Sequence, residues 1–369
     1  MRLSHAAKRQ IRQAYRRSVP YWIRAPLSKA RMENQYDVYR RVVPWPFRRL
    51  RGAEIYANPY DSHVARMFTT LLSGDTPVFV GRIGGSDWEA VKGFWANPRL
   101  YEDPLAREVA VRRVSEFNGY FDFAGDHSNF IRYLECLTEC YERADCLLYA
   151  GQHLTNQFGH NVFYKDELPL LRHVCQGKSL INYLFMEDVR PFLDTFRVWG
   201  EGRRILIVSP FSRTIEIQNR RRNELIVDYK YPDFELLPYQ TPVTYNTGDG
   251  TKNRLQVSVQ NWHEQCELMA QDISRLDFDI AWLSCASYGM YLGDFIRNEM
   301  HGKAVYIGGI LNVLFNIYGQ RYDASYYNRF IRPETRIEAL ENADMDRLSG
   351  GRLYPNEALR AYFGKKPPE

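Results

Sequence analysis

The sequence predicts an α/β fold, with a Rossmann-like, mostly parallel sheet and helices on both faces. Two observations predict it. Short apolar runs of the kind that form buried strands alternate with longer segments in which apolar residues recur at helical spacing. Several of the short runs end in glycine or serine, which is typical of a strand that turns tightly into a helix. Strands separated by helices indicate βαβ units and therefore a parallel sheet.

Seven apolar runs are expected to be strands, at 78–83, 146–150, 179–185, 204–208, 234–237, 280–284 and 303–307. The expected helices lie at 61–73, from Ser86 onward, at 104–117, 128–143, 213–226, 258–275, 290–300 and after the glycines 308–309. The helix over 128–143 is supported by helical spacing of Phe130, Tyr133, Leu134, Leu137 and Tyr141. The prolines and glycines near 228–255 predict a long connection there.

We expect three parts along the chain: a basic helical extension over 1–60, a Rossmann-like domain over 61–335 and a tail over 336–369. The 369 residues are 45% hydrophobic, which is ample for a packed core. No apolar run is long enough to predict a membrane-spanning helix. The six cysteines include no Cys-x-x-Cys pair, and neither a secretory signal nor an Asn-x-Ser/Thr acceptor occurs. These observations predict buried thiols and a cytoplasmic protein.

Positive charge gathers at the beginning of the chain. Residues 1–51 hold 14 Lys and Arg against only Glu33 and Asp37, so the remainder is net acidic although the whole chain carries +5. Such a basic, aromatic-containing arm fits an anionic membrane surface, and a peripheral association is expected. A structural extension packed on the domain is the alternative, and nucleic-acid binding is less favoured.

The segment Val78 to Glu89 carries the strongest functional signal. It reads as a buried strand, a Gly84-Gly85 turn and a helix start that holds Asp87 and Glu89. Ligands of open parallel sheets bind at the carboxyl ends of strands, and carboxylate oxygens there suit Mg²⁺ or Mn²⁺. The competing interpretation is a capping box, with Ser86 as the N-cap and Glu89 three residues later.

Other residues at strand ends are candidates for substrate binding. Arg82 lies inside the first strand, where its charge requires a phosphate or a carboxylate partner. Gly84, Gly85 and Ser86 are candidates as well, because a two-glycine turn lets the backbone approach a ligand closely. The remaining candidates are hydroxyls, glycines and arginines that follow three further strands: Ser209 and Arg213; Ser287, Tyr288 and Gly289; Gly308, Gly309 and Arg321. The carboxyl ends of parallel strands lie at one edge of a sheet, so these residues are expected to converge.

Histidine and cysteine chemistry is not favoured. His153 and His160 are seven residues apart and no His-x₃-His pair occurs, so zinc is not expected. Asp126-His127 is a candidate general base, although a surface turn is the commoner role of such a pair. Cys285 has no assignable histidine partner and is interpreted as a core residue.

With these motifs in place, the chain resembles the GT-D type of glycosyltransferase, which has a Rossmann-like fold and a metal-linked Asp-x-Glu near the beginning of its domain. It is also similar to a broader group of bacterial and viral polysaccharide-locus proteins. The motifs that carry the resemblance are Arg-Ile-Gly-Gly-Ser (82–86), Ser-Pro-Phe (209–211), Ser-Tyr-Gly (287–289) and Gly-Gly-x₅-Phe-x₃-Gly-x-Arg (308–321). They span residues 75–330. Gly84-Gly85-Ser86 departs from the acidic lead-in of GT-D enzymes.

The resemblance implies transfer of a hexose from a nucleotide sugar, UDP-linked, to a glycan or glycoconjugate acceptor. It implies that Asp87 and Glu89 bind a divalent cation, Mn²⁺ or Mg²⁺, which holds the diphosphate. Two alternatives stay open. One is another transferase of polysaccharide biosynthesis, such as a pyruvyl- or phospho-transferase. The other is a non-catalytic binding module in which the acids are helix caps.

Overall fold

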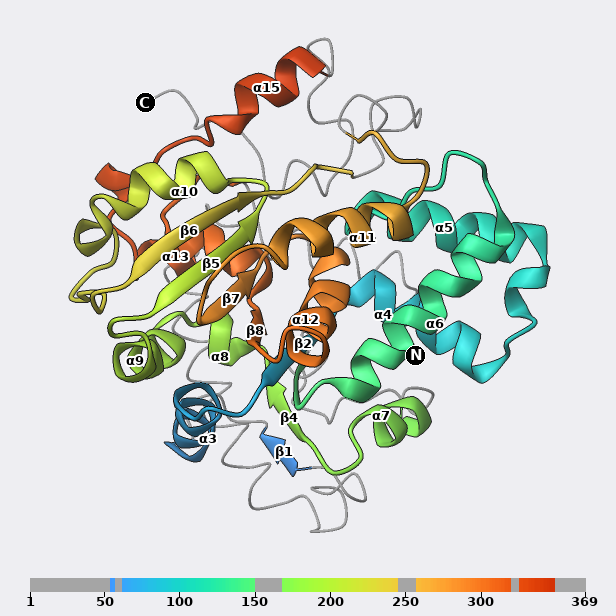
Figure 1. The fold of residues 1–369 in the computed structure, drawn as a ribbon, viewed down its shortest axis with the longest axis horizontal. Coiled ribbons are helices and arrows are strands. Elements are labelled where there is room, and N and C mark those ends of the chain that lie inside the picture. Colours follow the sequence, from blue (N-terminus) through green and yellow to red (C-terminus); the bar gives the residue numbers. More distant parts are fainter. Residues whose placement is uncertain (1–53, 57–61, 150–167, 245–256, 320–324, 349–369) are drawn as a thin grey trace, which may run out of the picture.

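The computed structural model describes residues 54–56, 62–149, 168–244, 257–319 and 325–348. Its centre is one eight-stranded sheet in which every pair of neighbours is parallel (Figure 1). The spatial order of the strands is β1-β4-β3-β2-β8-β7-β5-β6. Their bounds are β1 (Glu54–Tyr56), β2 (Val78–Ile83), β3 (Cys146–Tyr149), β4 (Ser179–Asn182), β5 (Arg204–Ser209), β6 (Glu235–Gln240), β7 (Ile280–Leu283) and β8 (Lys303–Tyr306).

Helices cover both faces of the sheet. On one face lie α3 (Ser62–Ser73), α8 (Leu184–Glu187), α9 (Arg190–Trp199), α10 (Ser212–Asn219) and α13 (Leu311–Leu314). On the other lie α4 (Gly85–Ala96), α5 (Pro104–Asn118), α6 (His127–Arg143), α7 (Leu168–Val174), α11 (Trp262–Ile273) and α12 (Tyr288–Asn298). Two further helices, α14 (Ser325–Asn328) and α15 (Glu341–Leu348), follow α13 in the chain.

The face that each helix occupies follows from the direction of its crossover. The connections that lead to a strand nearer the β1 edge contain α4–α7, α11 and α12, which lie on one face of the sheet. The connections that lead to a strand nearer the β6 edge contain α3 and α8–α10, which lie on the other face. All crossovers therefore share one hand, as parallel connections in sheets almost always do.

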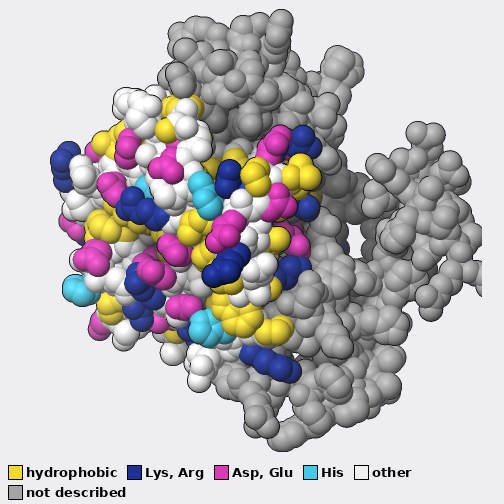
Figure 2. All heavy atoms as spheres, turned by 90° about the vertical axis from the view of Figure 1, so that its right-hand side faces the viewer, with side chains coloured by type: hydrophobic (Ala, Val, Ile, Leu, Met, Phe, Trp, Pro, Cys, Tyr) yellow, Lys and Arg dark blue, Asp and Glu magenta, His cyan; other side chains and the backbone are white. Residues whose placement is uncertain are grey.

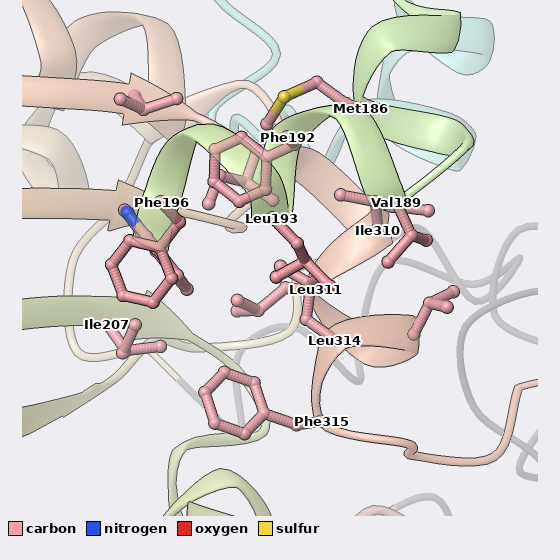
Figure 3. Close-up of a cluster of buried hydrophobic side chains, with 14 of the residues drawn as sticks. Met186, Val189, Phe192, Leu193, Phe196, Ile207, Ile310, Leu311, Leu314 and Phe315 are labelled. Carbon is pink, nitrogen blue, oxygen red and sulfur yellow. The ribbon is translucent and has the colours of Figure 1, made fainter. Parts of the chain in front are cut away.

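Two hydrophobic cores sandwich the sheet, because neighbouring residues of a strand point to opposite faces. Leu206 belongs to the core under α11 and α12, whereas Ile207 belongs to the core under α9 and α13. Figure 3 shows part of the core under α9 and α13, where Phe192 and Phe196 of α9 pack near Leu311 and Leu314. Phe196 also meets the Trp282 ring of β7 edge-on, with ring centroids 4.7 Å apart.

The predicted α/β class, the parallel sheet and helices on both faces are confirmed. All seven expected strands form, although the one expected over 179–185 ends at Asn182 and helix α8 begins at Leu184. Strand β1 is an additional edge strand of three residues. The helix expected over 213–226 was too long, since α10 ends at Asn219. Part of the long connection expected near 228–255 is strand β6, whose Pro238 is tolerated because β6 lies at the sheet edge.

The tail expected from 336 onward is not separate over its described part, because Glu341 of α15 bonds to α10. Of the helical extension expected over 1–60, residues 54–56 form strand β1 of the sheet, so this part of the prediction is wrong, and residues 1–53 and 57–60 lie outside the described residues. All six cysteines are free thiols, and all but Cys136 are buried. Within the described ranges, no helix combines the length and apolar character that crossing a membrane requires.

Candidate functional site

The carboxyl edge of the central strands is the natural place for a ligand. There β2 leads into α4 on one face, whereas its neighbour β8 leads into the segment 308–310 and α13 on the other face. Neighbouring strands whose following helices diverge to opposite faces leave a crevice between them at that edge. The same divergence occurs between β5 and β7, which precede α10 and α12.

Arg82 lies near the carboxyl end of β2, at the edge where the chains following β2 and β8 diverge. Its guanidinium carbon lies 4.3 Å from the centre of the Tyr183 ring and 5.7 Å from that of Tyr306. Both tyrosines are fixed, because Tyr183 donates to the Ile307 carbonyl at 2.6 Å and Tyr306 donates to the Ala286 carbonyl at 2.5 Å. The charge is therefore held by aromatic faces, which favour a cation.

Gly308 lets the guanidinium approach the backbone. Its φ of 65° lies in the left-handed region, and a Cβ atom there would clash with the Arg82 Nη1. Only glycine satisfies both requirements without strain. Gly308 thus leaves room for the Arg82 guanidinium beside the backbone, and its predicted role in substrate binding, like that of Gly309, stays a prediction.

Asp87 lies in a buried polar cluster beneath the edge. It is 3% exposed, and its carboxylate accepts bonds from the Tyr133 hydroxyl, at 2.5 Å, and from the Asn118 amide. Ser86 in turn donates to Oδ1 of the Asn118 side chain. Burial raises the pKa of Asp87 to about 7, although the two donors and the charge of Arg82 act in the opposite direction.

Glu89 points elsewhere. Its side chain is 42% exposed and forms an ion pair with Lys92 at 3.0 Å. Both acids lie inside α4, and positions two apart on a helix project about 200° from each other. One cation therefore cannot be held by both carboxylates in this geometry, and the described residues contain no group of three metal-ligating side chains. A shared Mn²⁺ or Mg²⁺ does not fit these residues.

The capping-box interpretation is also wrong. The N-cap of α4 is Gly84, without a side-chain cap bond, and Ser86 lies within the helix. The helix begins one residue before the expected position, which moves both acids from the junction into the helix itself.

The strand end at β5 is occupied by the chain itself. The Arg213 and Thr214 amides donate to the Glu341 carboxylate at 2.9 and 3.2 Å, and the Arg213 side chain pairs with Asp344. Glu341 is 4% exposed, and Ser209 is fully buried. This strand end, where Ser209 and Arg213 were expected to bind substrate, thus holds an internal carboxylate on its amides.

The motif after β7 is structural in its contacts. The Ser287 hydroxyl donates to the Asn118 carbonyl at 2.8 Å and accepts from the Trp262 indole at 2.9 Å. Tyr288 is 1% exposed and shares a bond of 2.7 Å with Thr244. A Cβ at Gly289 would lie 3.1 Å from the Tyr306 ring, so the glycine makes room for that ring.

The remaining residues singled out in the sequence either lie outside the described residues or have structural contacts. Arg321, His153 and His160 lie outside the described residues. Asp126 is the N-cap of α6, accepting from the Ser128 amide. Cys285 is buried, as expected of a core residue.

Sequence reasoning missed Tyr183 and Tyr306, which flank Arg82. Both lie at the carboxyl end of a strand, so their position was a usable signal. It also missed Asn118 and Tyr133, for which no local pattern exists. Comparison of the chain with known protein families, characterised proteins and solved structures found no match.

Proposed function

We propose that this chain is a glycosyltransferase that moves a sugar from a UDP-linked donor to a glycan or glycoconjugate acceptor. The observation that carries the proposal is Arg82, a cation fixed between two tyrosine rings at the carboxyl edge of a parallel sheet. A nucleotide diphosphate is the type of anion that such edges bind.

In this proposal Arg82 takes the role that the sequence assigned to a divalent metal cation, which is to neutralise the diphosphate. The acceptor oxygen forms a bond to the anomeric carbon of the sugar while the bond from that carbon to the diphosphate oxygen breaks. The diphosphate leaves with the electron pair, and the fixed positive charge of Arg82 stabilises it. The proton of the acceptor hydroxyl passes to the departing diphosphate oxygen, so that the products are the glycosylated acceptor and UDP. Asp87 touches no solvent-facing surface, so its part is to position Asn118 and Tyr133 rather than to take that proton.

The experiment is a screen of nucleotide sugars against the full chain, each with Mn²⁺, with Mg²⁺ and with EDTA. Slow hydrolysis of a UDP-sugar, followed by NMR, is expected in all three conditions. Arg82→Gln is expected to abolish it, and Arg99→Gln, an exposed arginine in the loop after α4, is the matched control. Turnover of phosphorylated donors other than nucleotide sugars would favour the pyruvyl- or phospho-transferase. Binding without turnover would favour the binding module.

For residues 1–51 we propose attachment to an anionic membrane surface, on the strength of their 14 basic residues. The full chain is expected to float with vesicles containing phosphatidylserine at low salt and not with neutral vesicles. Retention by duplex DNA in place of vesicles would overturn this part of the proposal.

A further inference from the structure

A pocket lies between α5 and α6, where residues 119–126 join the two helices. Its volume is about 460 Å³, which suits a small organic ligand. Figure 2 shows the side of the molecule that carries α5 and α6, where acidic, basic and hydrophobic side chains are interspersed. The lining side chains that matter are aromatic (Tyr120, Phe121, Phe123, Phe130) or ionisable (Arg107, Glu108, Asp122, Asp126, His127).

The aromatic side chains form a braced wall. The rings of Phe121 and Phe123 are 5.1 Å apart, and Tyr120 packs against Phe130 with ring centroids separated by 5.6 Å. Fixed aromatic faces bind the apolar face of a ring at little entropic cost. A flat or puckered ring is therefore the ligand shape that the wall accommodates.

Two lining side chains contain a buried polar atom without a partner. The Tyr120 hydroxyl and the His127 Nε2 make no hydrogen bond within the described residues, and Tyr120 is only 1% exposed. An unpaired buried polar group is costly, so its retention calls for an explanation. A ligand that carries hydroxyl groups would satisfy both atoms.

The charge of the pocket restricts the ligand further. Three carboxylates, those of Glu108, Asp122 and Asp126, outnumber the single guanidinium of Arg107. Asp122 already accepts from the amides of Ala124 and Asp126, at 3.0 and 2.7 Å, so the charge is built into the loop. A phosphorylated or otherwise anionic molecule is repelled here, so the UDP-linked sugar donor of the proposed function is not expected to bind in this pocket.

The pocket is tied to the carboxyl edge of the sheet. Asn118, the last residue of α5, bonds to Asp87, and its carbonyl accepts from Ser287. The next residue, Gly119, accepts from the Thr244 hydroxyl at 2.6 Å, and Tyr120 of the pocket follows directly. The two sites therefore share a rigid connection, with opposite charges at its ends.

We infer that this pocket binds a neutral sugar residue of the acceptor. The assignment as acceptor rests on the proposed function, whereas the binding of a neutral sugar rests on the pocket alone. Arg82 attracts the anionic donor, and the aromatic, acidic pocket receives the uncharged sugar.

The test uses methyl glycosides of glucose, galactose and N-acetylglucosamine as probes, with binding to the full chain followed by saturation-transfer NMR. At least one is expected to bind. Tyr120→Phe is expected to weaken it about threefold to tenfold, the loss of one neutral hydrogen bond, without lowering the melting temperature. Phe123→Ala is expected to weaken it further, whereas Phe117→Ala, an exposed phenylalanine of α5 outside the pocket, leaves binding unchanged.

UDP binding is measured on the same variants and is expected to be unaffected by either pocket substitution. Glycosides that bind wild type and both pocket variants equally, or that do not bind at all, overturn the inference. So does tighter binding of tetramethylammonium, which would assign the pocket to an organic cation. If the pocket substitutions weaken glycoside binding but wild type does not bind UDP, the result supports the sugar site and overturns the proposed function.

Discussion

Asp87→Asn offers the most quantitative test of the buried cluster at the carboxyl edge. Burial raises the pKa of Asp87 from 3.8 to about 7, so in the folded protein this carboxyl retains a proton that the unfolded chain has lost. A difference of about three pKa units corresponds to about 4 kcal/mol of folding free energy.

Because its pKa is raised, the folded protein binds the Asp87 proton more tightly than the unfolded chain does. The stabilising effect of the raised pKa is fully present below about pH 4 and is lost as the pH rises through about 7. Asparagine does not titrate. The free energy of unfolding of wild type, relative to that of Asp87→Asn, is therefore expected to fall by up to about 4 kcal/mol between about pH 4 and pH 8.

The substitution is compatible with the fold. The Tyr133 hydroxyl can still donate to the new amide oxygen, and rotation of the Asn118 amide lets its oxygen accept from the new NH₂. Ser86, now facing the Asn118 NH₂, can accept in place of donating.

Urea unfolding across this pH range is the assay, with Glu89→Gln, at an exposed carboxylate of the same helix, as the control variant. Profiles of wild type and Asp87→Asn that run parallel would refute the reasoning, because they would mean that burial does not raise the pKa of Asp87.

Three further predictions concern the same edge. Gly308→Ala is expected to cost about 1–2 kcal/mol in urea unfolding from its left-handed φ and, by displacing Arg82, to weaken UDP binding measured by calorimetry. Gly85→Ala, where a Cβ meets nothing within 4 Å, is the control; equal UDP affinity in both variants would contradict this role of Gly308. Glu341→Gln is expected to lower the free energy of unfolding by about 1–2 kcal/mol, because it loses a charged acceptor at the start of α10, and to leave UDP affinity unchanged. Glu89→Gln is expected to change stability by less than about 1 kcal/mol and to leave hydrolysis in Mn²⁺ unchanged; a Mn²⁺-specific loss would restore the shared-cation site.

The fold was largely predictable because its signals are local. Apolar runs such as 204–208 and 280–284 contain enough buried residues to identify a strand without knowledge of their neighbours. β1 was missed because three residues give no periodicity. The order of the strands could not be predicted, because it depends on pairings between segments far apart in sequence, such as β2 with β8.

For the candidate site, only the placement of single residues at strand ends was predictable. Arg82 and the glycines lie at the carboxyl edge of the sheet as expected, because those signals lie within a few residues, and their role in binding stays a prediction. The partners of Asp87 could not be predicted, because Tyr133 comes from α6 and Asn118 from the end of α5. Glu341 reaches Arg213 across 128 residues, and no local pattern announces an internal carboxylate at that helix start.

The most direct test of the central claim is calorimetric titration of UDP into the full chain in EDTA. Wild type and Arg99→Gln are expected to bind UDP without a divalent cation, and Arg82→Gln is expected to bind at least about tenfold more weakly, because it loses a charge-assisted contact to the diphosphate. Binding that requires Mn²⁺, or that survives Arg82→Gln unchanged, would contradict the assignment of Arg82 to the diphosphate.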